Sequence, residues 1–300
     1  MGFRIIRPGT FSILVDQGQP RHRGVGLPLG GPADDVSFTL GQALVGNRAD
    51  ARALEITLLG PDLEATATHG CVVMGAPFLV HLRGESIPVG TTFTVRPGDL
   101  LHIGTTGQGC RAYLCVRGGF ANRPHFGSTA SWLPIQKGEL LECPESLIQR
   151  RWLPDLPLLP RDLHRLRVLS GSHLSTTQRE RLAATLLRVK SDSNRMGLRL
   201  EAQPALPVSA NELPSAPVTP GCIQLPASGQ PILLGKDAQS IGGYPRIAHV
   251  ITADWPKVGQ LAPNQFIHLE WVQYQQAVHA YREQQRWLSD CVQHLLDSLY

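Results

Sequence analysis

The densest group of polar side chains follows a short apolar run in the last third of the chain. It comprises Lys236, Asp237, Gln239, Gly242, Gly243 and Tyr244. The lysine could balance a phosphate charge, and the aspartate could bind a metal ion or accept a proton. The paired glycines permit close approach of the backbone to a ligand, and the tyrosine supplies a phenol. A turn with a structural role alone would not need this set, so the stretch is predicted to be functional.

A second group precedes it and is rich in planar donors. Asn194, Arg195 and Arg199 lie within six residues of one another. Arginine binds carboxylate and phosphate groups through two parallel hydrogen bonds, so these residues are candidates for holding an anionic group. The alternative is a solvated loop followed by the edge of a strand.

A glycine-rich stretch near the N-terminus runs directly into a predicted helix and contains Gly30, Gly31 and Asp34. Backbone N–H groups at such a junction can hold an anion, and the helix dipole assists them. The nucleotide-binding pattern with a lysine after its second glycine is absent. The alternative interpretation is a structural turn in which Asp34 caps the helix.

A further turn, Arg117-Gly118-Gly119, follows an apolar strand, and a Ser/Thr-rich run begins at Ser128. This serine could line a cleft or decorate a turn. A nucleophilic role is not favoured, because the Gly-x-Ser-x-Gly elbow of serine hydrolases is absent.

Composition indicates the kind of fold that must position these residues. The chain has 300 residues, of which 42% are hydrophobic and 17% are charged, with 30 glycines and 24 prolines. This apolar content excludes wholesale disorder, and the excess of glycine and proline favours short strands and tight turns over long helices. The expected fold is therefore mainly β with peripheral helices.

Net charge, the length of apolar runs and cysteine spacing argue against several classes of function. The net charge of +4 is too small and dispersed to indicate nucleic acid binding. The longest apolar run, 71–80, is too short to span a bilayer, so no membrane association is expected. None of the six cysteines forms a C-x-x-C pair, and no metal site is predicted. We expect reduced thiols and a cytoplasmic location.

Periodicity and turn residues locate the elements. Helices are predicted at 33–44, 176–187 and 273–299, and the segment 51–59 fits either a strand or a helix. Strands are predicted at 11–15, 70–74, 78–82, 92–95, 100–103, 112–116, 168–169, 198–200, 221–225, 231–234, 248–251 and 266–269. The proline-rich segment 145–163 is the predicted linker between an N-terminal domain, 1–144, and a C-terminal domain, 164–300.

Several of these blocks, taken in order, resemble one known family. They are Leu44-Val45-Gly46-Asn47, Ala53-Leu54-Glu55-Ile56-Thr57, Asn194-Arg195-Met196-Gly197 and the block from Gln230-Pro231-Ile232 to Tyr244-Pro245. They resemble the family of the 5-oxoprolinase C component, also called the KipA or allophanate hydrolase subunit 2 family. That family includes the carboxyltransferase part of urea carboxylase. The resemblance extends from about residue 3 to residue 290.

The resemblance implies two cyclophilin-like β-barrel domains and a subunit of an ATP-dependent enzyme that opens 5-oxoproline to glutamate. It implies a small amide substrate, ATP as cofactor, and two partner proteins, the A component of 5-oxoprolinase and its KipI-like B component. In this interpretation Lys236, Asp237, Gln239 and Tyr244 line the reacting centre. The substrate is oriented by Asn194, Arg195, Arg199, Gln224, Gly242 and Gly243. The facing wall is formed by Gly30, Gly31, Asp34, Glu55, Arg117, Gly118, Gly119 and Ser128.

The sequence also departs from the family pattern. A Gly-rich loop normally follows Gly127-Ser128, whereas this chain continues directly to Trp132-Leu133-Pro134. This difference keeps two alternatives open. One is a non-catalytic regulator that binds the KipI-like B component. The other is the carboxyltransferase half of a biotin-dependent urea or amide carboxylase, in which biotin would be carried by another chain.

Overall fold

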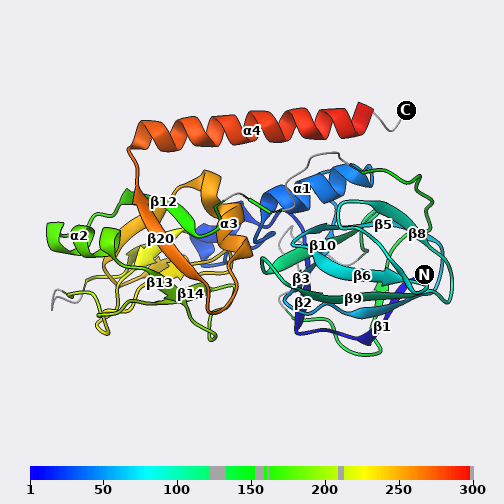
Figure 1. Ribbon diagram of the computed structural model, residues 1–300, viewed down its shortest axis with the longest axis horizontal. Helices are drawn as coiled ribbons and strands as arrows, with labels where there is room; N and C mark the ends of the chain where they lie inside the picture. Colours follow the sequence, from blue (N-terminus) through cyan, green and yellow to red (C-terminus); the bar gives the residue numbers. More distant parts are fainter. Residues whose placement is uncertain (122–132, 153–158, 161, 209–212, 298–300) are drawn as a thin grey trace. The chain divides into compact units, whose positions relative to one another are not determined.

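The chain forms two compact units in a computed structural model (Figure 1), which describes residues 1–121, 133–152, 159–160, 162–208 and 213–297. Unit 1 comprises Met1–Gly18, Asp34–Leu159 and Trp287–Tyr300, and unit 2 comprises Gln19–Ala33 and Pro160–Arg286. The main change of unit therefore falls within the expected linker. Two shorter segments differ from the sequence-based division. Segment 19–33 belongs to unit 2 although it lies in the predicted N-terminal domain, and segment 287–300 belongs to unit 1 although it lies in the predicted C-terminal domain.

Unit 1 is built from two antiparallel sheets. The first has the order β11 (Leu140–Glu142), β1 (Gly2–Arg7), β4 (Asp62–Ala65), β9 (Leu100–Thr106), β6 (Phe78–Leu82) and β7 (Glu85–Ser86). The second has the order β2 (Phe11–Val15), β3 (Ala53–Thr57), β10 (Arg111–Val116), β5 (His69–Gly75) and β8 (Thr92–Val95).

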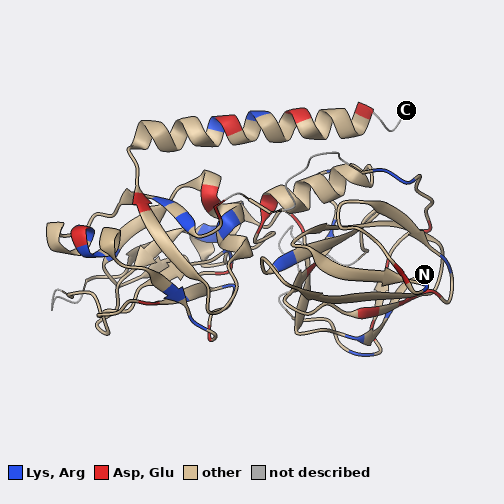
Figure 2. Cartoon of the chain, viewed as in Figure 1, with Lys and Arg blue, Asp and Glu red and all other residues tan. Residues whose placement is uncertain are grey.

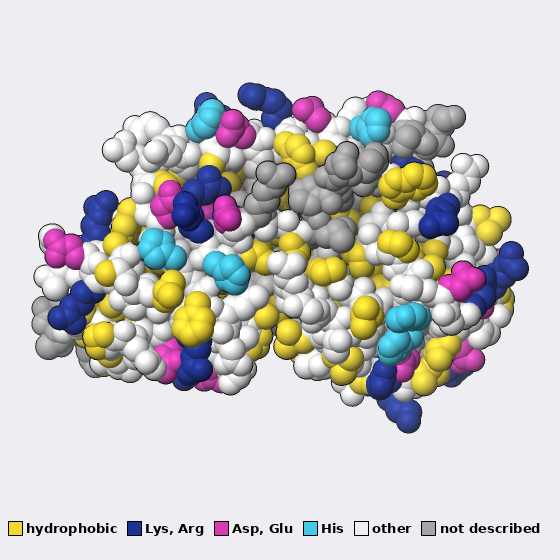
Figure 3. Space-filling model, viewed as in Figure 1, with side chains coloured by type: hydrophobic (Ala, Val, Ile, Leu, Met, Phe, Trp, Pro, Cys, Tyr) yellow, Lys and Arg dark blue, Asp and Glu magenta, His cyan; other side chains and the backbone are white. Residues whose placement is uncertain are grey.

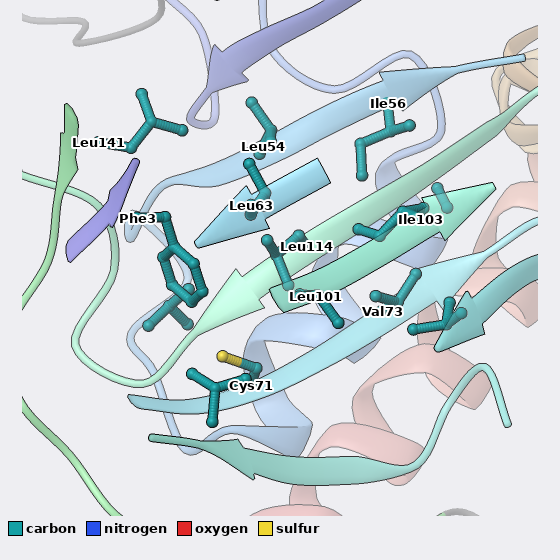
Figure 4. Close-up of a cluster of buried hydrophobic side chains, with 14 of the residues drawn as sticks. Phe3, Leu54, Ile56, Leu63, Cys71, Val73, Leu101, Ile103, Leu114 and Leu141 are labelled. Carbon is teal, nitrogen blue, oxygen red and sulfur yellow. The ribbon is translucent and has the colours of Figure 1, made fainter. Parts of the chain in front are cut away.

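The main core of unit 1 lies between these sheets, because both contribute buried side chains to one cluster. Figure 4 shows Phe3 and Leu63 of the first sheet close to Leu54 and Leu114 of the second. The longer strands present alternate residues to this core, as a period of two requires, for example Phe3 and Ile5 in β1. The two sheets therefore pack face to face around an apolar interior.

The second sheet is buried on both faces, which explains why two of its strands read as continuous apolar runs. In β10, Leu114 faces the core between the sheets, whereas Tyr113 and Cys115 belong to a second cluster on the opposite face. That face is covered by α1 (Asp35–Leu44) and by the end of α4 (Tyr274–Asp297), which buries Leu295 to 2% exposure. Strands covered on both sides lose the polar alternation that marks a half-exposed strand.

Unit 2 contains a closed seven-stranded barrel. Its order is β12 (Arg165–Ser170), β19 (Arg246–Val250), β16 (Cys222–Gln224), β17 (Ile232–Leu234), β14 (Gly197–Glu201), β13 (Leu187–Val189) and β20 (Phe266–Trp271). Strands β12 and β20 are parallel, and the other neighbours are antiparallel. Closure removes unpaired edges, and the interior is filled by leucine, isoleucine and valine. The expectation of a mainly β fold with peripheral helices is confirmed.

Short elements decorate the barrel of unit 2. They are η1 (Pro20–Val25), α2 (Thr176–Ala184), η2 (Thr252–Asp254), α3 (Trp255–Gln260) and a two-stranded ribbon of β15 (Ala216–Pro217) and β18 (Ile241–Gly242). Helix α2 begins at its predicted first residue, Thr176, and its N-cap is Ser175, which forms a capping box with Gln178. It ends at Ala184, three residues before its predicted end, because Leu187 pairs in the barrel.

The first described part of the predicted linker, 145–152, packs against the sheet of unit 1 that contains β5 and β8. The backbone N–H of Thr92 donates to Arg151, and Ile148 packs against Gly70 of β5. Lys and Arg are interspersed with Asp and Glu along the chain (Figure 2), and apolar side chains are interspersed among polar ones on the face drawn in Figure 3. Within the described residues, no helix combines the length and apolarity that crossing a bilayer needs.

Candidate functional site

Arg195 joins two of the predicted functional stretches within unit 2. It is 9% exposed, and its guanidinium makes a bidentate ion pair with Asp237: Nε to Oδ2 at 2.7 Å and Nη2 to Oδ1 at 2.9 Å. The backbone N–H of Asp237 also donates to the carbonyl of Arg195 at 3.1 Å. Two parallel charge-assisted hydrogen bonds fix the relative position of these segments more firmly than one would.

The glycine-rich stretch belongs to the same assembly. Nη2 of Arg195 donates to the carbonyl oxygen of Gly31 at 2.7 Å, and the N–H of Gly30 donates to the carbonyl of Lys236 at 3.0 Å. Both glycines have left-handed φ values, 65° and 80°, which a residue with a side chain rarely adopts. The structure thus brings Gly30 and Gly31 to Lys236 and Asp237, although about 200 residues separate them.

Lys236 is held over an aromatic ring. Its Nζ lies 4.5 Å from the centroid of the Trp255 ring, which is a cation–π contact. The indole Nε1 of Trp255 is buried and has no hydrogen-bond partner among the described residues. Gly221 permits this arrangement, since a Cβ there would lie 2.7 Å from that indole nitrogen. The ammonium is therefore positioned by a planar, uncharged ring that does not neutralise its positive charge.

Gln224 presents a buried amide close to the paired glycines. It is 1% exposed, and its Nε2 has no hydrogen-bond partner among the described residues. A Cβ at Gly242 would lie 2.7 Å from that nitrogen, so only glycine lets the ribbon strand β18 approach the amide. The register between β16 and β19 shifts at Gln224, which is typical of a bulge that redirects a side chain. A buried, unpaired donor of this kind can bind a carbonyl or carboxylate oxygen of a ligand.

The remaining predicted residues of unit 2 lie nearer the solvent. Asn194 closes a turn, its Oδ1 accepting from the N–H of Met196 at 2.9 Å. The Arg199 guanidinium is 56% exposed and lies 3.4 Å from a carboxylate oxygen of Asp192. Gln239 is exposed, and Tyr244 is 50% exposed beside Gly243. No described contact joins Asn194, Arg199 or Gln239 to Lys236.

Asp34 and Glu55 belong to a buried network inside unit 1. The Tyr113 hydroxyl donates to Glu55 at 2.9 Å and accepts from the N–H of Asp34 at 2.8 Å. Asp34 in turn caps α1, its carboxylate accepting from the N–H of Ser37 at 3.0 Å and from its hydroxyl at 2.6 Å. Burial and the nearby carboxylates raise the pKa of Tyr113 well above its usual value. These contacts position the start of a helix.

Arg117, Gly118 and Gly119 line a pocket of about 670 Å³ that is formed by residues of unit 1. The buried guanidinium of Arg52 and the side chain of Asn47 lie in the same lining. Neither residue was among the predicted site residues. Ser128, the last predicted wall residue, lies outside the described residues.

Sequence reasoning also missed Trp255 and Tyr113. Neither lies in a predicted motif: Trp255 gains its role from a contact with Lys236, and Tyr113 from contacts with Glu55 and Asp34, which are distant in the chain. No group of three histidine, cysteine or acidic side chains among the described residues could hold a metal ion. None of the six cysteines forms a disulfide, and burial raises the pKa of the Cys222 thiol to about 11.

Comparison with known proteins finds relatives of similar length and others in which the chain matches only a part. It is 32% identical over 95% of its length to the C component of the 5-oxoprolinase of Escherichia coli (strain K12), and it covers 96% of that protein. The crystal structure of TTHA0988 matches 90% of the chain at 33% identity and a TM-score of 0.82. The chain spans 56% of the length of TTHA0988.

A larger enzyme contains the same fold. The crystal structure of the Kluyveromyces lactis urea carboxylase matches 97% of the chain at 26% identity and a TM-score of 0.84, and the chain spans 29% of it. The sequence profile described as carboxyltransferase domain, subdomain A and B, matches residues 25–271. The chain therefore belongs to the family of carboxyltransferase domains with subdomains A and B.

Proposed function

We propose that this chain is a subunit of a 5-oxoprolinase, an enzyme that opens the ring amide of 5-oxoproline to glutamate at the expense of ATP. The similarity to a named 5-oxoprolinase component along nearly the whole of both chains supports this assignment. The A component and the KipI-like B component would complete the enzyme.

The observation that carries the proposal on the structural side is the position of Lys236. Its ammonium lies on the Trp255 ring, and the adjoining backbone is fixed by Gly30 and by the Arg195–Asp237 pair. Opening an amide places negative charge on the carbonyl oxygen, and a fixed cation stabilises that charge without rearranging in the reaction. Lys236 fits this role.

Two further groups supply binding and proton transfer. The unpaired Nε2 of Gln224 would donate to a carbonyl or carboxylate oxygen of the substrate, which satisfies a buried donor. The half-exposed phenol of Tyr244 would exchange a proton with the ring nitrogen as the amide opens. ATP would supply the phosphoryl group that activates the amide oxygen.

The test uses the chain co-expressed and purified with its partner components. We expect ADP release that depends on 5-oxoproline. Lys236→Ala should lower its rate roughly a hundredfold, the usual loss when one stabilising charge is removed. Tyr244→Phe should also lower it, through the loss of proton transfer. Lys190→Ala, an exposed lysine of the same unit, is the matched control and should retain the rate.

The outcomes separate the alternatives. Unchanged turnover in both variants would refute the site assignment. A stable complex with no turnover would favour a regulator that acts by binding the KipI-like B component.

The urea carboxylase likeness favours a second candidate, biotin-dependent carboxyl transfer to an amide nitrogen. In that case the complex would fix labelled bicarbonate onto an amide in the presence of a biotin carboxylase and its carrier. Fixation of label without 5-oxoproline-dependent ADP release would assign the chain to that reaction.

A further inference from the structure

The pocket of unit 1 has the size and construction of a small-molecule site. Its volume of about 670 Å³ lies within the range of about 300–1,000 Å³ in which proteins bind metabolites. Three stretches form its walls: the loop after α1, the turn after β10, and the chain from residue 144. The lining comprises Gly46, Asn47, Arg48, Asp50, Ala51, Arg52, Arg117, Gly118, Gly119, Phe120, Pro144, Glu145 and Ser146.

The walls of this pocket are fixed by side-chain hydrogen bonds. Nδ2 of Asn47 donates to the carbonyl of Val116 at 2.8 Å, and its Oδ1 accepts from the N–H of Gly118 at 2.7 Å. Gly118 and Gly119 have φ values of 90° and 73°, and a side chain at Gly118 would collide with the ring of Pro144. A pocket held in this way needs little rearrangement when a ligand binds.

Positive charge prevails in and beside the pocket. Its lining holds three arginines against Asp50 and Glu145, and Asp50 already pairs with Arg48 in the solvent. Arg52 is 6% exposed, and burial lowers the pKa of its guanidinium despite the attraction of Asp16. Burial and then the charge of Arg117 lower the pKa of Arg151.

Arg117 is the cation available to a ligand. Its side chain is exposed, and no carboxylate among the described residues lies within ion-pairing distance of it. The nearby positive charge of Arg151 makes the place unfavourable for a further cation and favourable for an anion. A guanidinium matches the planar pair of oxygens in a carboxylate or phosphate group.

We propose that this pocket binds a small metabolite through an oxyanion, a carboxylate or a phosphate group, which pairs with Arg117. Arg52 adds positive potential from the buried wall. The volume exceeds that of a bare ion, so the rest of the ligand occupies the space between the glycine turn and the loop after α1. The proposal does not depend on the 5-oxoprolinase assignment, because it concerns binding to this chain alone.

Calorimetric titration of the isolated full chain at low ionic strength tests the proposal. The probes are inorganic phosphate, L-glutamate and L-5-oxoproline, which separate a phosphate ligand from a carboxylate one. We expect at least one probe to bind, and Arg117→Ala to weaken its binding about tenfold or more. Arg117→Lys should retain part of the affinity, because it keeps the charge and loses the bidentate geometry. Arg96→Ala, another exposed arginine of unit 1, should bind like the parent.

Two results would overturn the proposal. One is the absence of binding for all three probes up to about 10 mM, well above the affinities typical of metabolite sites. The other is equal affinity in Arg117→Ala and Arg96→Ala. Loss of 5-oxoproline binding in Lys236→Ala but not in Arg117→Ala would count against the pocket and in favour of the site on unit 2.

Discussion

The guanidinium of Arg195, a predicted substrate-binding group, contacts partners that the sequence alone does not identify. Its donors already bind Asp237 and the carbonyl of Gly31. In this arrangement Arg195 positions the backbone on either side of Lys236. The resemblance implied that Arg195 orients the substrate. It would have to do so while also keeping these structural contacts.

Arg195→Ala should therefore destabilise unit 2. Removing one member of a buried ion pair leaves the other charge uncompensated, at a cost of about 3 kcal/mol or more. Arg199→Ala is the matched control, because its guanidinium is 56% exposed and should contribute less than about 0.5 kcal/mol. Urea denaturation of the two variants measures both values. Equal stability would show that the Arg195–Asp237 pair does not hold the segment.

The imidazole of His249 links stability to pH. Burial lowers its pKa, while Nε2 lies 3.0 Å from the Thr219 hydroxyl. As pH falls below about 6.5, the unfolded chain takes up a proton that the folded chain resists, so the free energy of unfolding decreases. One proton limits the slope to about 1.4 kcal/mol per pH unit.

His249→Gln should reduce this dependence between about pH 7.5 and pH 5.5, a window that brackets the ordinary histidine pKa. The exposed His279→Gln should leave it unchanged. Denaturation curves at several pH values decide the point, and parallel curves for the parent and His249→Gln would contradict the assignment.

At the scale of elements, the start of α1 depends on a single buried cap. Asp34 is 1% exposed and satisfies the N–H and the hydroxyl of Ser37. Asp34→Ala should cost about 2 kcal/mol, the upper end for an N-cap, since no water replaces the lost acceptor. Ser175→Ala, at the surface helix α2, should cost about 1 kcal/mol. Hydrogen exchange at the Ser37 amide should quicken in the first variant alone.

Periodicity predicted the elements whose pattern is strong and local. Helix α1 and strands β2, β6 and β8 lie where expected, and the ambiguous segment around Glu55 is the strand β3. The strand β4 was not predicted, because Asp62 and Glu64 are poor strand formers whose pairing is decided by their neighbours in the sheet. Strands β15 and β18 have two residues each, too few to show a period.

The candidate site could be predicted only where polar side chains or glycines are concentrated in one short stretch of sequence. The block around Lys236 and the glycines at 30 and 31 come together in unit 2. Trp255 was missed, because its role arises from a tertiary contact that no short pattern records. Asn47 lies in a block that carries the family resemblance, but its contact with the turn after β10 was not predicted. Glu55, in contrast, proved to be part of a buried structural network.

At the scale of the whole molecule, each unit is assembled from separated stretches of chain. Leu295 is 2% exposed in the second core of unit 1, far along the chain from the strands that it covers. Leu295→Ala should cost about 2–4 kcal/mol, whereas Leu186→Ala, at a 60% exposed position, should cost little. Hydrogen exchange should show the loss of protection spreading to α1 and β2. A loss confined to the last turns of α4 would contradict this view.

The position of Leu295 in the chain also governs how the protein can fold as it is made. Residues 34–159 leave the ribosome well before the helix end that covers their second sheet. Translation at about 5–20 residues per second separates the two events by roughly 7–28 seconds. During that interval the part of the apolar face that α4 covers, next to α1, is open to chaperones or to neighbouring nascent chains. Unit 1 can therefore complete its core only after the sequence of unit 2 has been synthesised.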